Sequence, residues 1–120
     1  MAATWPFDLP FKVDVRPLGE GVVLVSVAGE IDIATVGRLR TTLTPLSSDV
    51  RVRLLVCDLS EVSFFGCGAV SVLLAAKAAL MTRGARLRIV AARNVVLRPL
   101  SVMGLLGELS VRPDVRSALG

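Results

Sequence analysis

Residues 54–70 read LLVCDLSEVSFFGCGAV, and this stretch decides the fold because it carries a buried strand into a helix. An unbroken apolar run within residues 51–59 predicts a central strand covered on both faces. The polar residues at 60–61 predict a turn, and the composition of residues 70–82 predicts a helix. Cys67 therefore stands between two glycines where a strand is expected to give way to a helix.

A β-hairpin is predicted upstream of this stretch. Residues 12–16 alternate polar and apolar side chains, which is the pattern of a half-buried strand. Glycines on either side of Glu20 predict a turn, and residues 22–27 are typical of a second strand. We therefore expect these two strands to pair with each other.

Helices are predicted on both sides of the central strand. Apolar residues three and four apart predict a helix over residues 33–44, with Asp32 as its cap. Pro45 disfavours helical geometry in the residue before it, so this helix should end there. Further along the chain, residues 87–91 predict a strand and residues 94–103 a helix.

The order of these elements predicts a single α/β domain. Residues 108–111 predict a short edge strand, and Asp114 is expected to cap a last helical turn over residues 115–119. Helices that alternate with strands imply crossover connections and a mostly parallel sheet, which the opening hairpin makes mixed. We expect about five strands and four helices within residues 12–120, after an N-terminal lead-in over residues 1–11.

The composition indicates a globular protein of a reducing compartment. Apolar residues make up 53% of the 120 residues, with four Phe and one Trp, so the core should be aliphatic. Two cysteines are too few to form a disulfide framework. A low cysteine content fits a reducing, cytoplasmic location best. The N-terminus lacks the pattern of a secretory signal, and the longest uncharged stretch, residues 62–76, is too short to cross a membrane.

The absence of histidine restricts the possible chemistry. It excludes Ser-His-Asp and Cys-His catalysis, and two cysteines alone are too few ligands for a zinc site within one chain. We therefore expect that the protein is not an enzyme and binds neither a metal nor a cofactor. Residues 66–71 resemble a dinucleotide-binding turn. The third glycine and the acid expected about 20 residues further on are both absent.

Basic residues dominate the second half of the chain. The net charge is +4, and no acidic residue lies between Glu61 and Glu108. An acidic partner or nucleic acid is one interpretation of this asymmetry. We favour the other, solvated arginines that flank buried strands, and expect no nucleic-acid partner.

Three segments together resemble a known family. They are Val-Ala-Gly-Glu-Ile-Asp at residues 27–32, Cys-Asp-Leu-Ser-Glu-Val-Ser-Phe-Phe at 57–65, and residues 97–109 with their Met-Gly-Leu turn. In this order and spacing they resemble the STAS domain, and more narrowly a stand-alone bacterial anti-sigma-factor antagonist. The resemblance covers nearly all of residues 12–119 and implies the STAS fold.

The resemblance also implies a phosphorylation site, from which this chain departs. In the family the segment reads Phe-Ile-Asp-Ser-Ser-Gly-Leu, and a partner anti-sigma factor that is also a kinase phosphorylates the first serine. Aligned without a gap, that serine falls on Cys67 and the preceding aspartate on Gly66. The second serine, the glycine and the leucine fall on Gly68, Ala69 and Val70. A serine kinase needs an alcohol oxygen, so the usual phosphorylation switch should be missing.

The resemblance implies a regulator that binds a kinase-type anti-sigma factor, which then releases a sigma factor. The expected contact surface comprises Asp32, Gly66, Cys67, Gly68, Ala69 and Val70. For Asp32, capping of the helix that follows it is an alternative of equal weight to contact with a partner. Cys67 is either a redox site or a small residue that fills the place of the serine. The alternative function is a redox-sensing or small-molecule-sensing STAS module outside a sigma pathway. The sequence leaves open whether the protein forms a homodimer.

Overall fold

The structure is a computed structural model that describes residues 11–120. The lead-in expected over residues 1–11 therefore lies, except for Phe11, outside the described residues. Phe11 itself is buried, and the Arg38 guanidinium lies 4.9 Å from the centre of its ring.

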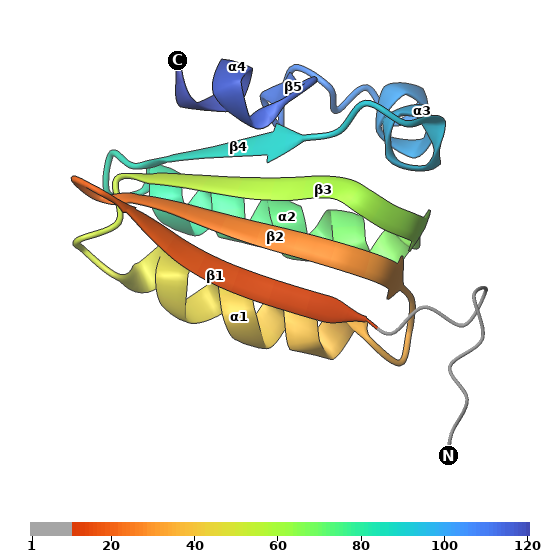
Figure 1. Cartoon of the computed structure of the whole chain (residues 1–120), viewed down its shortest axis with the longest axis horizontal. Coiled ribbons are helices and arrows are strands. Elements are labelled where there is room, and N and C mark those ends of the chain that lie inside the picture. The colour runs from red at the N-terminus through yellow and green to blue at the C-terminus, as the bar shows by residue number, and fades with distance from the viewer. Residues whose placement is uncertain (1–10) are drawn as a thin grey trace.

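One five-stranded sheet forms the centre of the molecule (Figure 1). Its strands lie in the order β1-β2-β3-β4-β5, with β1 antiparallel to β2 and every other pair parallel. This arrangement confirms the predicted mixed α/β sheet with an N-terminal hairpin. The strands are β1 (Lys12–Gly19), β2 (Val22–Ile31), β3 (Leu54–Phe65), β4 (Arg86–Val90) and β5 (Val111–Arg112), and the helices are α1 (Val36–Ser48), α2 (Cys67–Met81), α3 (Asn94–Val102) and α4 (Val115–Leu119).

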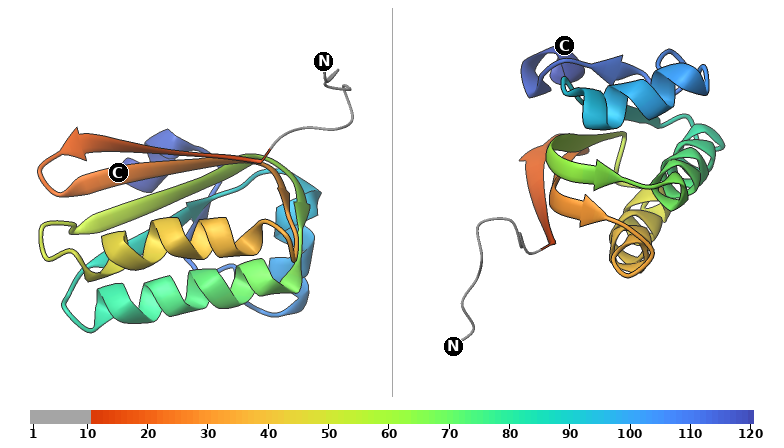
Figure 2. Two further views of the ribbon diagram at one scale, coloured as in Figure 1. Left: turned by 90° about the horizontal axis from the view of Figure 1, so that it is seen from below. Right: turned by 90° about the vertical axis from the view of Figure 1, so that its right-hand side faces the viewer.

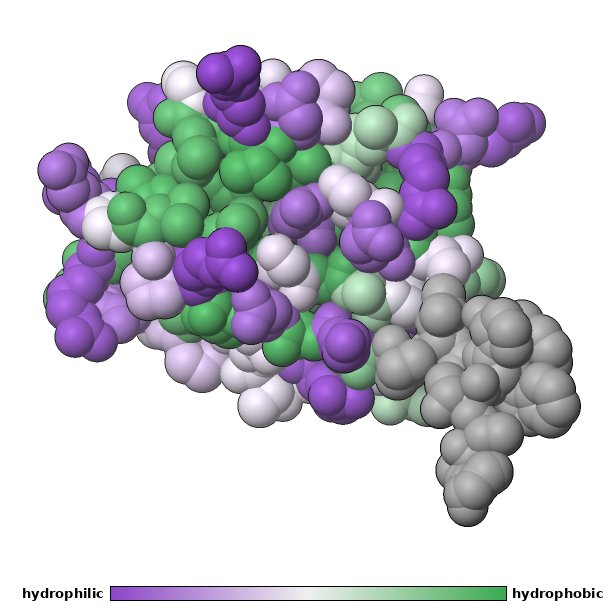
Figure 3. Space-filling model, in the orientation of Figure 1, coloured by the Kyte–Doolittle hydropathy of each residue, from purple (hydrophilic) through white to green (hydrophobic). Residues whose placement is uncertain are grey.

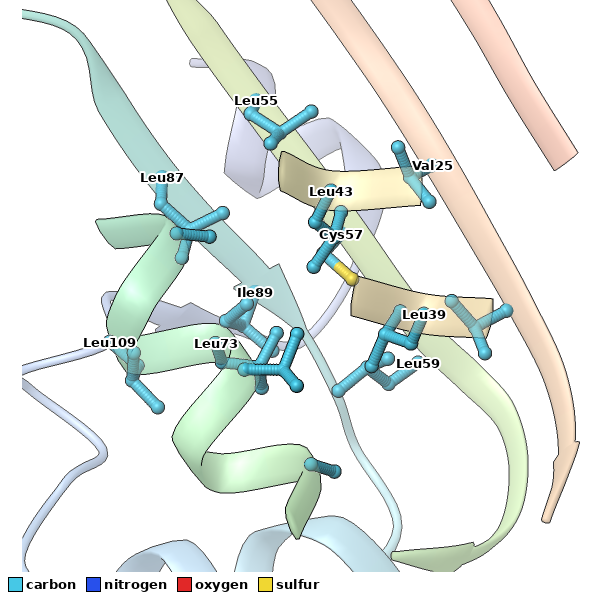
Figure 4. Packing of buried hydrophobic residues seen from close by; sticks show 14 of the residues in the cluster. Val25, Leu39, Leu43, Leu55, Cys57, Leu59, Leu73, Leu87, Ile89 and Leu109 are labelled. Atoms are coloured by element: carbon cyan, nitrogen blue, oxygen red, sulfur yellow. The ribbon is translucent and has the colours of Figure 1, made fainter. Parts of the chain in front are cut away.

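Helices α1 and α2 lie side by side on one face of the sheet (Figure 2). Alternate residues of β2 point toward them, as period-two strand geometry requires. The core between helices and sheet is aliphatic, as the composition predicts, and the side chain of Cys57 points into it from β3 (Figure 4). Its fully buried members include Val25, Leu39, Leu43, Leu55, Leu59, Leu73 and Ile89.

The opposite face of the sheet carries a smaller apolar cluster under α4. Val56 and Val90 are buried there against Ala118, with Leu24 and Leu54 partly buried beside them. Figure 3 views this face and shows apolar side chains gathered toward its upper left. The central strand β3 is thus apolar on both sides, which explains the unbroken run in its sequence.

The turn predicted at residues 60–61 is wrong, because β3 continues to Phe65. The pairing of β3 with β2 shifts register twice within this part of the strand. The Asp58 carboxylate accepts a hydrogen bond from the backbone N–H of Ser60 at 3.0 Å. The polar residues therefore lie at an irregularity in the pairing of β2 with β3. The strand β3 continues through this irregularity.

The end predicted for the first helix is also wrong, because α1 continues past Pro45 to Ser48. Proline removes one backbone donor, but packing of the last turn compensates for this loss. Leu46 packs against the core, and the buried Ser47 hydroxyl donates to the carbonyl of Leu43 at 2.7 Å. The other elements lie near their predicted positions, although β5 has only two residues.

Several arginines of the basic half are tied to backbone carbonyls. Arg83 donates to Val52 at 2.7 Å, Arg88 to Ala118 at 2.7 Å and Arg93 to Val62 at 2.9 Å. These side chains join segments far apart in the sequence. For these three, the favoured interpretation of solvated arginines fits only in part, because the side chains flank strands but bind backbone carbonyls.

Replacement of Leu73 by alanine tests the core. The side chain is fully buried between α2 and the sheet, so its truncation should lower the free energy of unfolding by about 2–5 kcal/mol. The control is Val50→Ala, at a side chain that is 81% exposed, and its effect should stay within about 0.5 kcal/mol. Urea unfolding of both variants measures the difference, and equal losses would contradict this packing.

Candidate functional site

The parallel pairing of β2 and β3 brings their C-terminal ends together. Ile31 lies beside Phe65 in the ladder, and the Gly66 N–H donates to the carbonyl of Ile31 at 3.0 Å. The loop at residues 32–35 and the start of α2 therefore lie together at one edge of the sheet, the edge at which these parallel strands end. Figure 2 shows this edge in its right-hand view, with the N-terminal ends of α1 and α2 beside the strand ends.

Asp32 organises the loop that precedes α1. Its carboxylate accepts hydrogen bonds from the backbone N–H groups of Ala34 and Thr35, at 2.9 and 3.1 Å. The Thr35 hydroxyl donates to the carbonyl of Glu30 at 2.6 Å and accepts the N–H of Asp32. These bonds hold the turn before α1. The predicted cap at Asp32 and helix start at residue 33 are wrong, because α1 begins at Val36 and its N-cap residue is Thr35.

Two exposed apolar side chains lie at this edge, and sequence reasoning missed both. Ile33, in the loop that Asp32 organises, is 98% exposed, and Phe64 is 49% exposed. A signal existed for Phe64: consecutive strand residues face opposite sides, so the burial of Phe65 turns Phe64 outward. No such signal exists for Ile33, which the sequence pattern assigns to the first turn of a helix.

Glycine at position 66 allows the close approach of two strand ends. A Cβ atom at Gly66 would lie 3.1 Å from the carbonyl oxygen of Ile31 and 3.4 Å from the ring of Phe64. Gly68 is less constrained, since a Cβ there would meet Val36 only at 3.5 Å. The N–H groups of Cys67 and Gly68 belong to the first turn of α2, where helix geometry supplies no acceptor.

The two cysteines occupy different environments. Cys57 is buried, Cys67 is exposed, and both are free thiols. Burial, with a smaller contribution from the charge of Asp58, raises the pKa of Cys57 to about 12.

Burial corrects part of the predicted contact surface. Asp32, Gly66 and Gly68 are half-buried and Cys67 is exposed. Ala69 and Val70 belong to the hydrophobic core, so their side chains cannot contact a partner directly. Ile33 and Phe64 are exposed at the same end of the sheet, and we call Asp32, Ile33, Phe64, Gly66, Cys67 and Gly68 the junction surface.

Within residues 11–120 no cluster of three or more His, Cys, Asp or Glu side chains could hold a metal ion. The helices of this described part are also too short or too polar to cross a membrane.

Comparisons with known proteins identify relatives of this chain. The model of the STAS domain family matches residues 17–118. The anti-sigma-F factor antagonist RsfB of Mycobacterium tuberculosis is 34% identical over 85 residues, which cover 71% of this chain and 68% of RsfB.

Solved structures agree with this result. An anti-sigma factor antagonist from Mycobacterium paratuberculosis superposes with a TM-score of 0.85 at 29% identity, over 98% of this chain and 96% of that one. The anti-sigma factor antagonist SpoIIAA in its unphosphorylated form superposes with a TM-score of 0.77, over 90% of this chain and 93% of that one. At 16% identity, SpoIIAA supports the fold alone. The predicted STAS fold is confirmed.

Thiol labelling tests the two environments. An aromatic disulfide reagent should modify one thiol per folded chain quickly, and Cys67→Ser should abolish this reaction. Cys57 should stay unreactive from about pH 7 to 9, because with a pKa of about 12 only about one thiol in a thousand is ionised at pH 9. Rapid modification of both thiols in the folded protein would contradict the burial of Cys57.

Proposed function

This chain belongs to the STAS domain family, and we propose that it acts as an anti-sigma-factor antagonist that binds a kinase-type anti-sigma factor through the junction surface. The proposed binding unit is the domain at residues 12–120. By occupying the anti-sigma factor, the protein would release a sigma factor and so regulate transcription. This role requires a cytoplasmic location and no catalysis by the chain itself.

The observation that carries the proposal is the exposure of Ile33 and Phe64 beside the start of α2. A single exposed apolar side chain needs no explanation, but two at the same end of the sheet give a partner an apolar anchor. Gly66 and Gly68 carry no side chains, so a partner backbone can approach closely. The N–H groups of Cys67 and Gly68 offer hydrogen-bond donors at the same place.

The loss of the hydroxyl at position 67 suggests how the binding is regulated. A phosphoryl group would add about −1.5 to −2 charges to the junction surface and alter its fit to a partner. Cys67 has no alcohol oxygen to accept it. We therefore propose that the complex forms whether or not ATP is present, so that antagonism depends on how much of this protein the cell contains.

A second candidate function rests on the exposure of Cys67. Oxidation or a mixed disulfide would add bulk and polarity at the junction surface, as a redox-sensing module requires. Partner binding that changes on thiol oxidation, with the change lost in Cys67→Ser, would favour this alternative.

Binding measurements on point variants test the docking surface. The partners are candidate anti-sigma factors from the same organism, and calorimetry gives the dissociation constant. Phe64→Ala and Ile33→Ala should each weaken the complex by about tenfold or more, which is typical of truncated apolar anchors. Val50→Ala, an equally conservative truncation at an exposed site outside the junction surface, should stay within about twofold. Equal effects of all three variants would contradict the proposal.

Incubation of the same complex with ATP tests the missing switch. Mass spectrometry should find stable complex and no phosphate on the wild-type chain. The Cys67→Ser variant restores an alcohol oxygen and should accept one phosphoryl group from a kinase-type partner. Phosphate on any residue of the wild-type chain would show that the switch lies elsewhere.

A further inference from the structure

Strand β4 has an open edge over its N-terminal half. β5 pairs only with Ile89 and Val90. Backbone groups alternate sides along a strand: the Arg86 N–H donates to Arg53 toward β3, whereas the Ile89 N–H donates to Ser110 on the β5 side. The backbone of Leu87 therefore also faces the β5 side. The hydrogen bonds among residues 11–120 give its N–H and C=O no partner there.

A hollow of about 660 Å³ adjoins this open edge. The last turns of α2, the start of β4 and the segment at residues 107–112 surround it, and Figure 1 shows how α2 leads into β4 at this end of the sheet. Met81, which is 58% exposed, gives the hollow an apolar wall. With a rise of about 1.5 Å per residue, α2 separates Met81 from Cys67 by about 20 Å.

The hollow is strongly basic. Lys77, Arg86, Arg88 and Arg112 line it, and the one carboxylate among its lining residues, Glu108, binds Lys77 at 2.7 Å. Arg88 donates to carbonyls at the end of α4. No carboxylate among residues 11–120 forms an ion pair with Arg86 or Arg112, so both remain available to an acidic ligand.

We propose that this hollow binds an extended acidic segment of another protein, which adds a short strand beside the N-terminal half of β4. The segment would hydrogen-bond to the free N–H and C=O of Leu87, as peptides do at open sheet edges. Carboxylates two residues apart in the segment lie on one face of the added strand, which suits contact with the arginines. An apolar side chain between them fits against Met81.

A polypeptide fits this edge better than a nucleic acid. A phosphate backbone has oxygen acceptors for the arginines and for the Leu87 N–H, but no donor for the Leu87 C=O. The lining of the hollow also contains no aromatic side chain on which a base could stack. Because this site and the junction surface lie at opposite ends of α2, the protein could hold two partners at once.

The test uses a fluorescent nine-residue peptide of alternating glutamate and valine, with anisotropy as the readout. The Arg86→Glu/Arg112→Glu variant should bind it at least about tenfold more weakly than the wild type, because two attractive contacts become repulsive. Arg40→Glu/Arg116→Glu makes the same charge change at exposed sites outside the hollow and should change binding by less than about twofold. If the double variant fails to fold, Arg86→Gln serves in its place. This milder change at an exposed site should also weaken binding.

Two further measurements separate strand addition from mere charge attraction. N-methylation of every peptide bond removes the backbone donors on both sides of the added strand and should abolish binding, and the Leu87 amide should exchange more slowly when the unmodified peptide is bound. A nine-nucleotide single strand that binds more tightly than the peptide would overturn the proposal, as would equal weakening in the two double variants. Phe64→Ala should leave peptide binding unchanged, so failure here is distinguishable from failure of the junction surface.

Discussion

The pairing of β2 with β3 is the constraint on which the rest of the structure depends. Because these strands are parallel and adjacent, both end at the same side of the sheet. There the Gly66 N–H donates a hydrogen bond to the carbonyl of Ile31 at 3.0 Å. The loop before α1 and the first turn of α2 are thereby held together without a side-chain cap on α2. The candidate site is a consequence of this pairing, because its residues come from the ends of both strands and the segments that follow them.

Most of the fold was predictable from patterns with a direct physical cause. Alternation identified the hairpin, an unbroken apolar run identified the central strand, and helix-to-strand order identified the parallel sheet. The errors arose where tertiary packing overrides a local signal. Pro45 does not end α1, because the residues after it still pack on the core, and the polar pair at residues 60–61 marks an irregular ladder in place of a turn.

The candidate site was predictable in position but not in composition. Alignment with the family places a residue at a helix start, but it does not say which way the side chain points. Ala69 and Val70 turn inward because they lie on the face of α2 that packs on the sheet, and the exposure of Ile33 follows from a loop held by Asp32. The substitution of sulfur for oxygen at position 67 is visible in the sequence alone, and the structure adds that this thiol is exposed whereas Cys57 is not.

Hydrogen exchange in the proposed complex with a candidate anti-sigma factor tests the central claim, that a partner docks where β2 and β3 end. The amides of Ile33, Cys67 and Gly68 are expected to exchange rapidly in the free protein, because the hydrogen bonds among residues 11–120 give them no acceptor, whereas those of Asp32, Ala34 and Thr35 are bonded within the loop. Complex formation should slow exchange at Ile33, Cys67 and Gly68 by about tenfold or more. Slower exchange confined to the sheet face under α4, with the amides of Ile33, Cys67 and Gly68 unchanged, would contradict the account.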